Sequence, residues 1–303
     1  MTAPSPRRSF WGVMISLLAH GLIVSTWVSR IASVKSSLHL GDGALGLALL
    51  GTAIGSVAAI PVCGVLVARY GSRTAVRWTG LGFAIALALP AFAVNWVTLF
   101  LSLLIYGGFA GANDVAMNAQ AVATEKLLGT PAMSRFHAMF SVGGIVGAAL
   151  GGVIAGRGVS PSGHLVTGAA LFAAIALFAP TLMMDTHDSG QVRAHGRLRR
   201  IPPALVALSV IGFCIFLSEG AIADWTGVYL RQVIGAGVGV APLGYAGFSA
   251  AMAIFRLAGD AIVLQIGRAA TIRFGGLIAA AGMLIAVLSH STGWALAGFA
   301  AAG

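Results

Sequence analysis

The sequence predicts an all-α polytopic membrane protein. Of its 303 residues, 58% are hydrophobic and only 9% are charged, and the mean hydropathy is +0.94. An ordinary soluble protein has about 25% charged residues, so this chain has too few charges to cover an aqueous surface. Apolar runs of about 20 residues recur along the chain, and each is long enough to cross a bilayer.

Nine complete spans follow from these runs. In chain order they lie at about residues 10–30, 43–68, 75–95, 97–121, 137–157, 164–184, 204–229, 241–265 and 271–290. A tenth apolar run begins at Gly293 and continues to Gly303 without a polar tail. We therefore expect the second half of the protein to be incomplete in this chain.

One long polar segment divides the spans into two groups. Most loops are short, but DTHDSGQVRAHGRLRRIPP is polar, basic and ends in proline, which is typical of a linker. We predict a six-helix bundle at residues 1–184, a cytoplasmic linker at 185–203, and a partial bundle of three spans and the start of a fourth at 204–303.

The positions of Lys and Arg predict the orientation. Thirteen of them lie in segments on the same side as the N-terminus, and four lie on the other side: Arg30, Lys35, Arg157 and Arg231. Because cytoplasmic loops are enriched in Lys and Arg, we expect a cytoplasmic N-terminus and a multi-pass protein of the bacterial plasma (inner) membrane. Basic residues scattered over short loops do not indicate a nucleic-acid surface.

The two halves share short sequences in register. VRWTGL at 76–81 matches IRFGGL at 272–277, and the twelve residues before each align without a gap. His20-Gly21 in the first span matches Glu219-Gly220 in the seventh. These matches predict a duplicated six-span unit, and parallel repeats of this kind are a known transporter plan.

The loop between the second and third spans resembles that of the major facilitator superfamily. In GVLVARYGSRT the residues that fit the family motif are Gly64, Leu66, Arg69, Gly71 and Arg73, with Ala68 in place of the usual Asp. GGIVGAALGG at 143–152 is similar to a glycine-rich element of the fifth span in that family, with Ala148 in place of Pro. The fold implied is two pseudo-repeated six-helix bundles.

Four strings resemble the rhizopine-transporter-like branch more closely: GANDVAMNAQAV, SRFHAMFSVGGIVGA, EGAIADWTGVYLR and GYAGFSAAMAIFRLAGD. The likeness covers essentially the whole chain, and relatives have twelve spans. It implies a monomeric secondary transporter that moves a small solute, sugar-like or cyclitol-like, by alternating access, with coupling to a proton or another ion. A non-transporting receptor or scaffold, or an inactive truncated product, is the alternative.

Polar residues inside spans are the candidates for a transport path, because a charge deep in hydrocarbon costs at least about 2.5 kcal/mol unless it faces a cavity or a partner. For a substrate or proton pathway they are Glu219, Asp114, Asn113, Asn118 and His20. Asp114 and Asn118 are four residues apart and share a helix face. His20 and Glu219 could pass a proton across the pseudo-two-fold axis. A structural role for each is the alternative.

Four further residues are candidates for gating or structural ion pairs. Arg256 and Asp260 are four residues apart in the eighth span, and Asp224 at the outer rim could pair with Arg30. The sequence contains no metal-ligand spacing, phosphate loop or nucleophile elbow, so it indicates neither an enzyme nor a cofactor.

Overall fold

The computed structural model describes residues 4–185 and 202–303, apart from the side chains of residues 204 and 260. Most of the predicted linker lies outside this range. The described residues form helices and connecting turns, with no strand among them. In chain order the elements are α1 (Pro6–Val28), α2 (Ile31–Ser37), α3 (Asp42–Tyr70), α4 (Ser72–Ala86), η1 (Leu89–Phe92), α5 (Trp96–Leu128), α6 (Met133–Gly156), α7 (Pro161–Phe178), η2 (Ala179–Leu182), α8 (Pro203–Gln232), α9 (Leu243–Ile266), α10 (Arg268–Leu288) and α11 (Thr292–Ala302).

Eight of the described helical segments are long and apolar enough to cross a membrane, and two shorter apolar helices cover Leu243–Gly259 and Thr292–Ala302. Each predicted span coincides with one of these helices, and α11 corresponds to the start of the tenth. The short helix α2 was not predicted. The chain is therefore an integral, multi-pass membrane protein, as the hydropathy indicates.

One span boundary that differs from the prediction is the C-terminal end of α5. The predicted span ends at residue 121, whereas α5 continues to Leu128 and ends at Gly129, which has a left-handed backbone (φ 68°). Glu125 on this last turn accepts hydrogen bonds from the backbone N–H groups of Ala132 and Met133, at 2.6 and 2.8 Å. Glu125 in these extra turns thus holds the start of α6.

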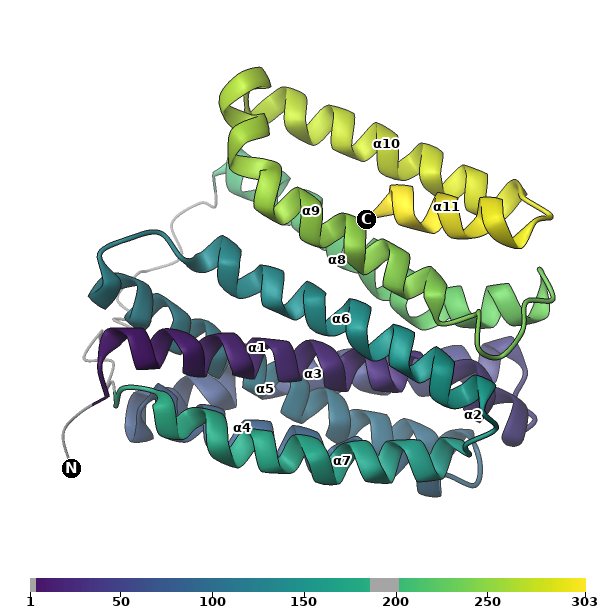
Figure 1. Ribbon diagram of the computed structural model, residues 1–303, viewed down its shortest axis with the longest axis horizontal. Helices are drawn as coiled ribbons and strands as arrows, with labels where there is room; N and C mark the ends of the chain where they lie inside the picture. Colours follow the sequence, from purple (N-terminus) through teal and green to yellow (C-terminus); the bar gives the residue numbers. More distant parts are fainter. Residues whose placement is uncertain (1–3, 186–201) are drawn as a thin grey trace.

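The helices form two groups that lie side by side (Figure 1). Helices α1 and α3–α7 pack into one bundle, in which the closest pairs are α3 with α5 and α1 with α6. Helices α8–α11 form the second group, and α6 against α9 is the main contact between the groups. We call the end of the first bundle that holds residue 6 the inner end and the opposite end the outer end.

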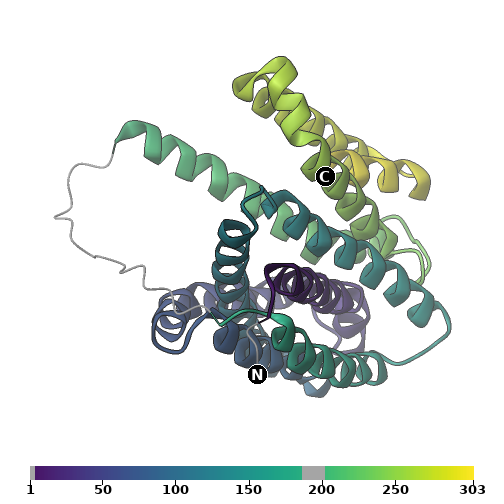
Figure 2. The same cartoon turned by 60° about the vertical axis from the view of Figure 1, so that its left-hand side comes forward.

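The two groups meet at the outer end and separate toward the inner end. The first half of α8 stands apart from the first bundle (Figure 2), and its Leu208, Phe213 and Phe216 side chains are exposed. At the outer end, the Gly152 and Gly239 backbones approach so closely that a Cβ on Gly239 would lie 3.1 Å from the Gly152 carbonyl oxygen.

Glycines permit the close helix pairs of the first bundle. A Cβ on Gly107 of α5 would lie 2.6 Å from Thr52 Cα of α3. A Cβ on Gly143 of α6 would lie 2.8 Å from the backbone nitrogen of Leu22 on α1. Close approach between backbones is a general means of packing helices in lipid, where dispersion contacts rather than the hydrophobic effect hold them together.

The internal repeat predicted from the sequence is visible in the backbone. Gly71 separates α3 from α4 with φ 80° and ψ 153°, and Gly267 separates α9 from α10 with φ 81° and ψ 158°. These two glycines are equivalent in the sequence alignment of the halves. A positive φ at the same aligned position supports the duplication, because both loops need a residue without a Cβ.

Candidate functional site

The contact between the two groups of helices carries a half-buried cation. Arg256 of α9 donates from Nη1 to Ser141 Oγ at 2.7 Å and to the His137 carbonyl oxygen at 3.3 Å, both on α6. Its guanidinium carbon lies 5.8 Å from the Phe140 ring centroid. Arg256 therefore reaches across to the first bundle. The side chain of Asp260, its predicted partner, lies outside the described residues.

Glu219 lies on α8, close to charged residues of both groups of helices. Its half-buried carboxylate is within electrostatic range of Arg256 on α9 and of Asp114 on α5. Among the described residues no ion pair joins Glu219 to Arg256. Glu219 on α8 and Arg256 on α9 are therefore neighbouring charges of the second group that do not form a direct contact.

Asp114 and Asn118 share a face of α5, as the spacing predicts. Asn118 Nδ2 donates to Asp114 Oδ1 at 3.2 Å and to the Asp114 carbonyl oxygen at 2.9 Å. Asp114 is exposed, and its charge reaches both His137 and Glu219. This face of α5 therefore looks toward the second group of helices.

His20 and Asn113 lie instead in the interior of the first bundle. His20 Nδ1 is 3.0 Å from Asn113 Nδ2, and Thr79 Oγ1 of α4 is 3.1 Å from Asn113 Oδ1. The His20 ring packs 4.7 Å from that of Phe83, centroid to centroid. The structure thus brings His20 to Asn113 rather than to Glu219. The register match gave its height in the membrane but not the direction in which the side chain points.

The pairing of Arg30 with Asp224 predicted from the sequence is wrong. Arg30 is only 1% exposed, and its Nε donates to His164 Nδ1 on α7 at 2.9 Å, within the first bundle. Asp224 is half-buried, and its charge reaches the hydroxyl groups of Tyr106 on α5 and Tyr245 on α9. It therefore lies between the two groups of helices and is not confined to the outer rim.

Tyr245 lies within electrostatic range of both carboxylates of α8, Glu219 and Asp224. It is 3% exposed, and the charges of Glu219, Arg256 and Asp224 all reach it. The groups named so far between α5, α6, α8 and α9 thus form one polar path along the interface of the halves. Sequence reasoning missed Tyr245 because a single tyrosine in an apolar span resembles a packing residue.

A lysine joins the two groups of helices at the outer end of these polar residues. Lys35 of α2 is 4% exposed, and its Nζ donates to Asp42 Oδ1 on α3 and to Gln232 Oε1 on α8, both at 2.5 Å. The contact with Gln232 joins the first bundle to the second. In the sequence Lys35 was only one of the few basic residues on the outer side, so its partner could not be predicted.

The residues of the loop motif have separate surroundings. Arg73 donates from Nε to the Pro180 carbonyl oxygen at 3.0 Å, which ties the loop to the end of η2. Arg69 lies over the Tyr70 ring at 5.3 Å. Gly71 has the positive φ described above, whereas a Cβ on Gly64 would meet nothing within 4 Å. The motif residues therefore stabilise the inner loop. None of them is among the residues of the polar path.

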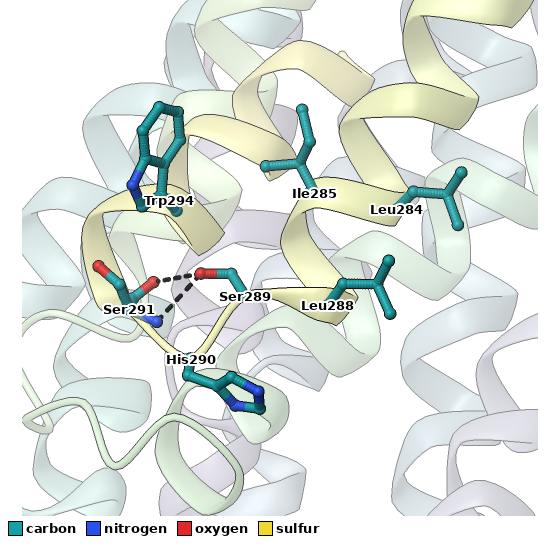
Figure 3. Close-up of a pocket in the computed structure, with 7 residues that line it drawn as sticks. All are labelled: Leu284, Ile285, Leu288, Ser289, His290, Ser291 and Trp294. Atoms are coloured by element: carbon teal, nitrogen blue, oxygen red, sulfur yellow. Dashed lines mark hydrogen bonds between the residues drawn. The ribbon is translucent and has the colours of Figure 1, made fainter.

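One hollow in the described part of the chain lies away from this path. It has a volume of about 590 Å³ and lies at the turn between α10 and α11, where Leu284, Leu288 and Trp294 surround a short Ser289–Ser291 turn (Figure 3). A second cavity of about 20 Å³ lies beside His20 and Asn113. No group of three potential metal ligands occurs among the described residues.

Comparisons with known proteins agree with this architecture. The model of the Major Facilitator Superfamily matches residues 10–303, so the chain belongs to that family. It is 34% identical over 292 residues to the transporter y4wD of Sinorhizobium fredii, covering 95% of this chain and 76% of that protein. It is 33% identical over 303 residues to the membrane protein MosC of Rhizobium meliloti, covering 100% of this chain and 74% of that protein.

Among solved structures the chain is similar to the nucleoside transporter NupG. The TM-score is 0.73 at 14% identity, over 98% of this chain and 79% of that structure. This likeness supports the fold alone. It confirms the major facilitator architecture that the loop motif and the repeat predict, and members of this family act on small molecules.

Proposed function

We propose that the protein is a secondary active transporter that carries a small polar solute along the path between its two halves. The observation that carries this proposal is the convergence of Asp114 from the first bundle with Glu219 and Arg256 from the second. Charged side chains are costly in a bilayer and mark substrate or ion pathways in membrane proteins. A scaffold that merely kept the fold would have no need of them.

The arrangement of the halves is consistent with alternating access. The outer end is closed by Lys35 with Gln232 and by the glycine contact, while the first half of α8 stands away from the first bundle (Figure 2). This is an inward-open arrangement if the N-terminus is cytoplasmic, as the positive charges favour. Rocking of one half against the other would then open the outer end.

The solute and its coupling follow from the chemistry of the path. Carboxylates, a guanidinium and tyrosine hydroxyls suit a solute with several hydroxyl groups, and a sugar-like or cyclitol compound is our proposal. Coupling to a proton is proposed because the path offers carboxylates that can take one up. The setting is the bacterial inner membrane, and the active unit is a monomer.

Uptake into proteoliposomes tests this function. Protein reconstituted with an imposed proton gradient would be supplied with a panel of radiolabelled sugars and cyclitols. We expect accumulation of at least one of them, a loss of more than about tenfold in E219Q and in D114N, and normal uptake in the matched control D185N. Asp185 is an exposed acid beyond the last turn of the first bundle.

Two results would count against the proposal. Unchanged uptake in both E219Q and D114N would show that these residues are not the site, although the protein would still be a transporter. Absence of flux for every solute, with the protein intact in the membrane, would favour the receptor or scaffold alternative.

A further inference from the structure

Three polar side chains gather in the outer half of the path, one from each of three helices. Tyr106 of α5 is 2% exposed, Tyr245 of α9 is 3% exposed, and Asp224 of α8 is half-buried. Asp224 lies about one and a half turns beyond Glu219, in the direction of Gln232. The cluster therefore lies between the Glu219 level and the closed outer end.

Two members of this cluster, Tyr106 and Asp224, lack the partners that buried polar groups usually have, whereas Tyr245 is hydrogen-bonded to Ser249. The Tyr106 hydroxyl is buried and has no hydrogen-bond partner. No ion pair or hydrogen bond to Asp224 occurs among the described residues, and Arg30, the partner predicted from the sequence, is bound to His164. Since buried polar groups are rarely unsatisfied, each such group calls for an explanation.

The surroundings leave the Asp224 charge without compensation. Helix α2 contributes Lys35, which is already bound to Asp42 and Gln232. Helix α9 contributes Tyr245 and, further inward, Arg256, whose Nη1 is bound to α6. Glu219, on the same helix as Asp224, adds a like charge, and α5 contributes Tyr106.

The remaining neighbours of α8 add no charge at this level. In α11 the sequence TGWALAGFAAA contains no titratable residue, and α1 contributes aromatic packing through Trp27, whose ring lies 6.5 Å from that of Tyr106. The single titratable residue within the spanning part of α1 is His20, in the core of the first bundle.

We propose that Asp224 is a proton-binding residue of the path and that the unpartnered Tyr106 hydroxyl is available to hydrogen-bond its carboxyl group. The role of this proton in transport rests on the proposed function. The binding of the proton to Asp224 does not. A half-buried carboxylate without a counter-charge in a bilayer is expensive when charged. It takes a proton from water on the outer side, and the Tyr106 hydroxyl can donate to the charged form or accept from the neutral one. The same proton leaves to inner water after the halves rock.

Infrared difference spectroscopy tests this site without a solute. Protein in lipid vesicles would be examined between acidic and alkaline buffer for the C=O band of a protonated carboxylic acid. We expect this band in the wild type, its loss in D224N, its return in D224E, and its persistence in the matched control D185N, which removes an exposed acid outside the path. Y106F should shift the frequency of the band, because it removes the hydroxyl that is available to hydrogen-bond the protonated carboxyl group.

Three outcomes overturn the assignment. The band could persist in D224N, or disappear in D185N, which would place the proton elsewhere. Removal of the band by sodium chloride at constant pH would make the site a sodium site. A band that behaves as expected in a protein with no solute flux would reject the transport function while leaving the proton site in place, so the two failures are distinguishable.

Discussion

The ammonium group of Lys35 lies 2.5 Å from Gln232 Oε1 and joins the first bundle to the second at the outer end of the path. The same nitrogen contacts Asp42, whose side chain is 72% exposed, so the carboxylate shares the lysine with solvent. Opening the outer end must break the contact with Gln232, because the two residues belong to different halves.

Removal of this lysine should make the path more accessible from outside. In K35Q, a cysteine introduced at Ser249 should react severalfold faster with a membrane-impermeant thiol reagent than in the otherwise identical protein. The native Cys63 and Cys214 would be replaced by alanine beforehand. Ser249 is buried against Gly144 at the contact of α6 with α9, so it reports on separation of the halves.

The control for this experiment is K126Q, which removes a lysine from the last turn of α5 at the opposite end. It should leave the labelling rate unchanged. Equal rates in the wild type and K35Q would mean that the glycine contact alone holds the outer end closed.

Two neighbouring glycines of α5 should differ sharply in their tolerance of alanine. A Cβ on Gly107 would lie 2.6 Å from Thr52 Cα, whereas a Cβ on Gly108 would meet its nearest atom, the Gly55 carbonyl oxygen, at 3.7 Å. G107A should therefore force α3 and α5 apart and destabilise the protein by about 1–3 kcal/mol. G108A should be close to neutral, and thermal unfolding in detergent compares the two. Equal stability would show that α3 and α5 can separate at little cost.

Loss of the Arg256 guanidinium should weaken the contact between the halves. R256Q removes the charge-assisted bond to Ser141 Oγ and the ring contact with Phe140, which together favour association of α9 with α6. A bond of this type contributes about 1.5–3 kcal/mol. R273Q, at an exposed arginine near the inner end of α10, is the matched control.

The measurement is the rate at which a crosslinker joins single cysteines placed on α6 and α9. We expect slower crosslinking in R256Q and an unchanged rate in R273Q. A rate in R256Q equal to that of the wild type would show that small-residue packing, and not the arginine, holds these helices together.

Removal of the His164 ring should destabilise the first bundle. H164A leaves the buried Arg30 Nε without its acceptor, beside an Nη2 that already has no partner. Leaving a buried donor unsatisfied costs about 1–3 kcal/mol, and more when it is charged. H290A, which removes an exposed imidazole at the α10–α11 turn, should have little effect. Thermal unfolding of both variants tests this, and a tolerant H164A would indicate that water reaches the guanidinium.

Much of the architecture could be predicted because it depends on local properties of the chain. Transfer to lipid is a property of each apolar run, so hydropathy located the spans that became α1 and α3–α11. A left-handed backbone needs glycine, so Gly71 and Gly267 marked the same loop in both halves. The shared face of Asp114 and Asn118 follows from the helix period alone.

Only the tertiary structure decided which side chains meet. The sequence placed His20 opposite Glu219 and Arg30 opposite Asp224, but packing turned His20 toward Asn113 and Arg30 toward His164. The rotation of a helix about its axis depends on contacts between distant segments, through glycines such as Gly107 and Gly143. The extent of each apolar helix is thus determined by the sequence itself, whereas the partner of each polar group depends on how the helices pack.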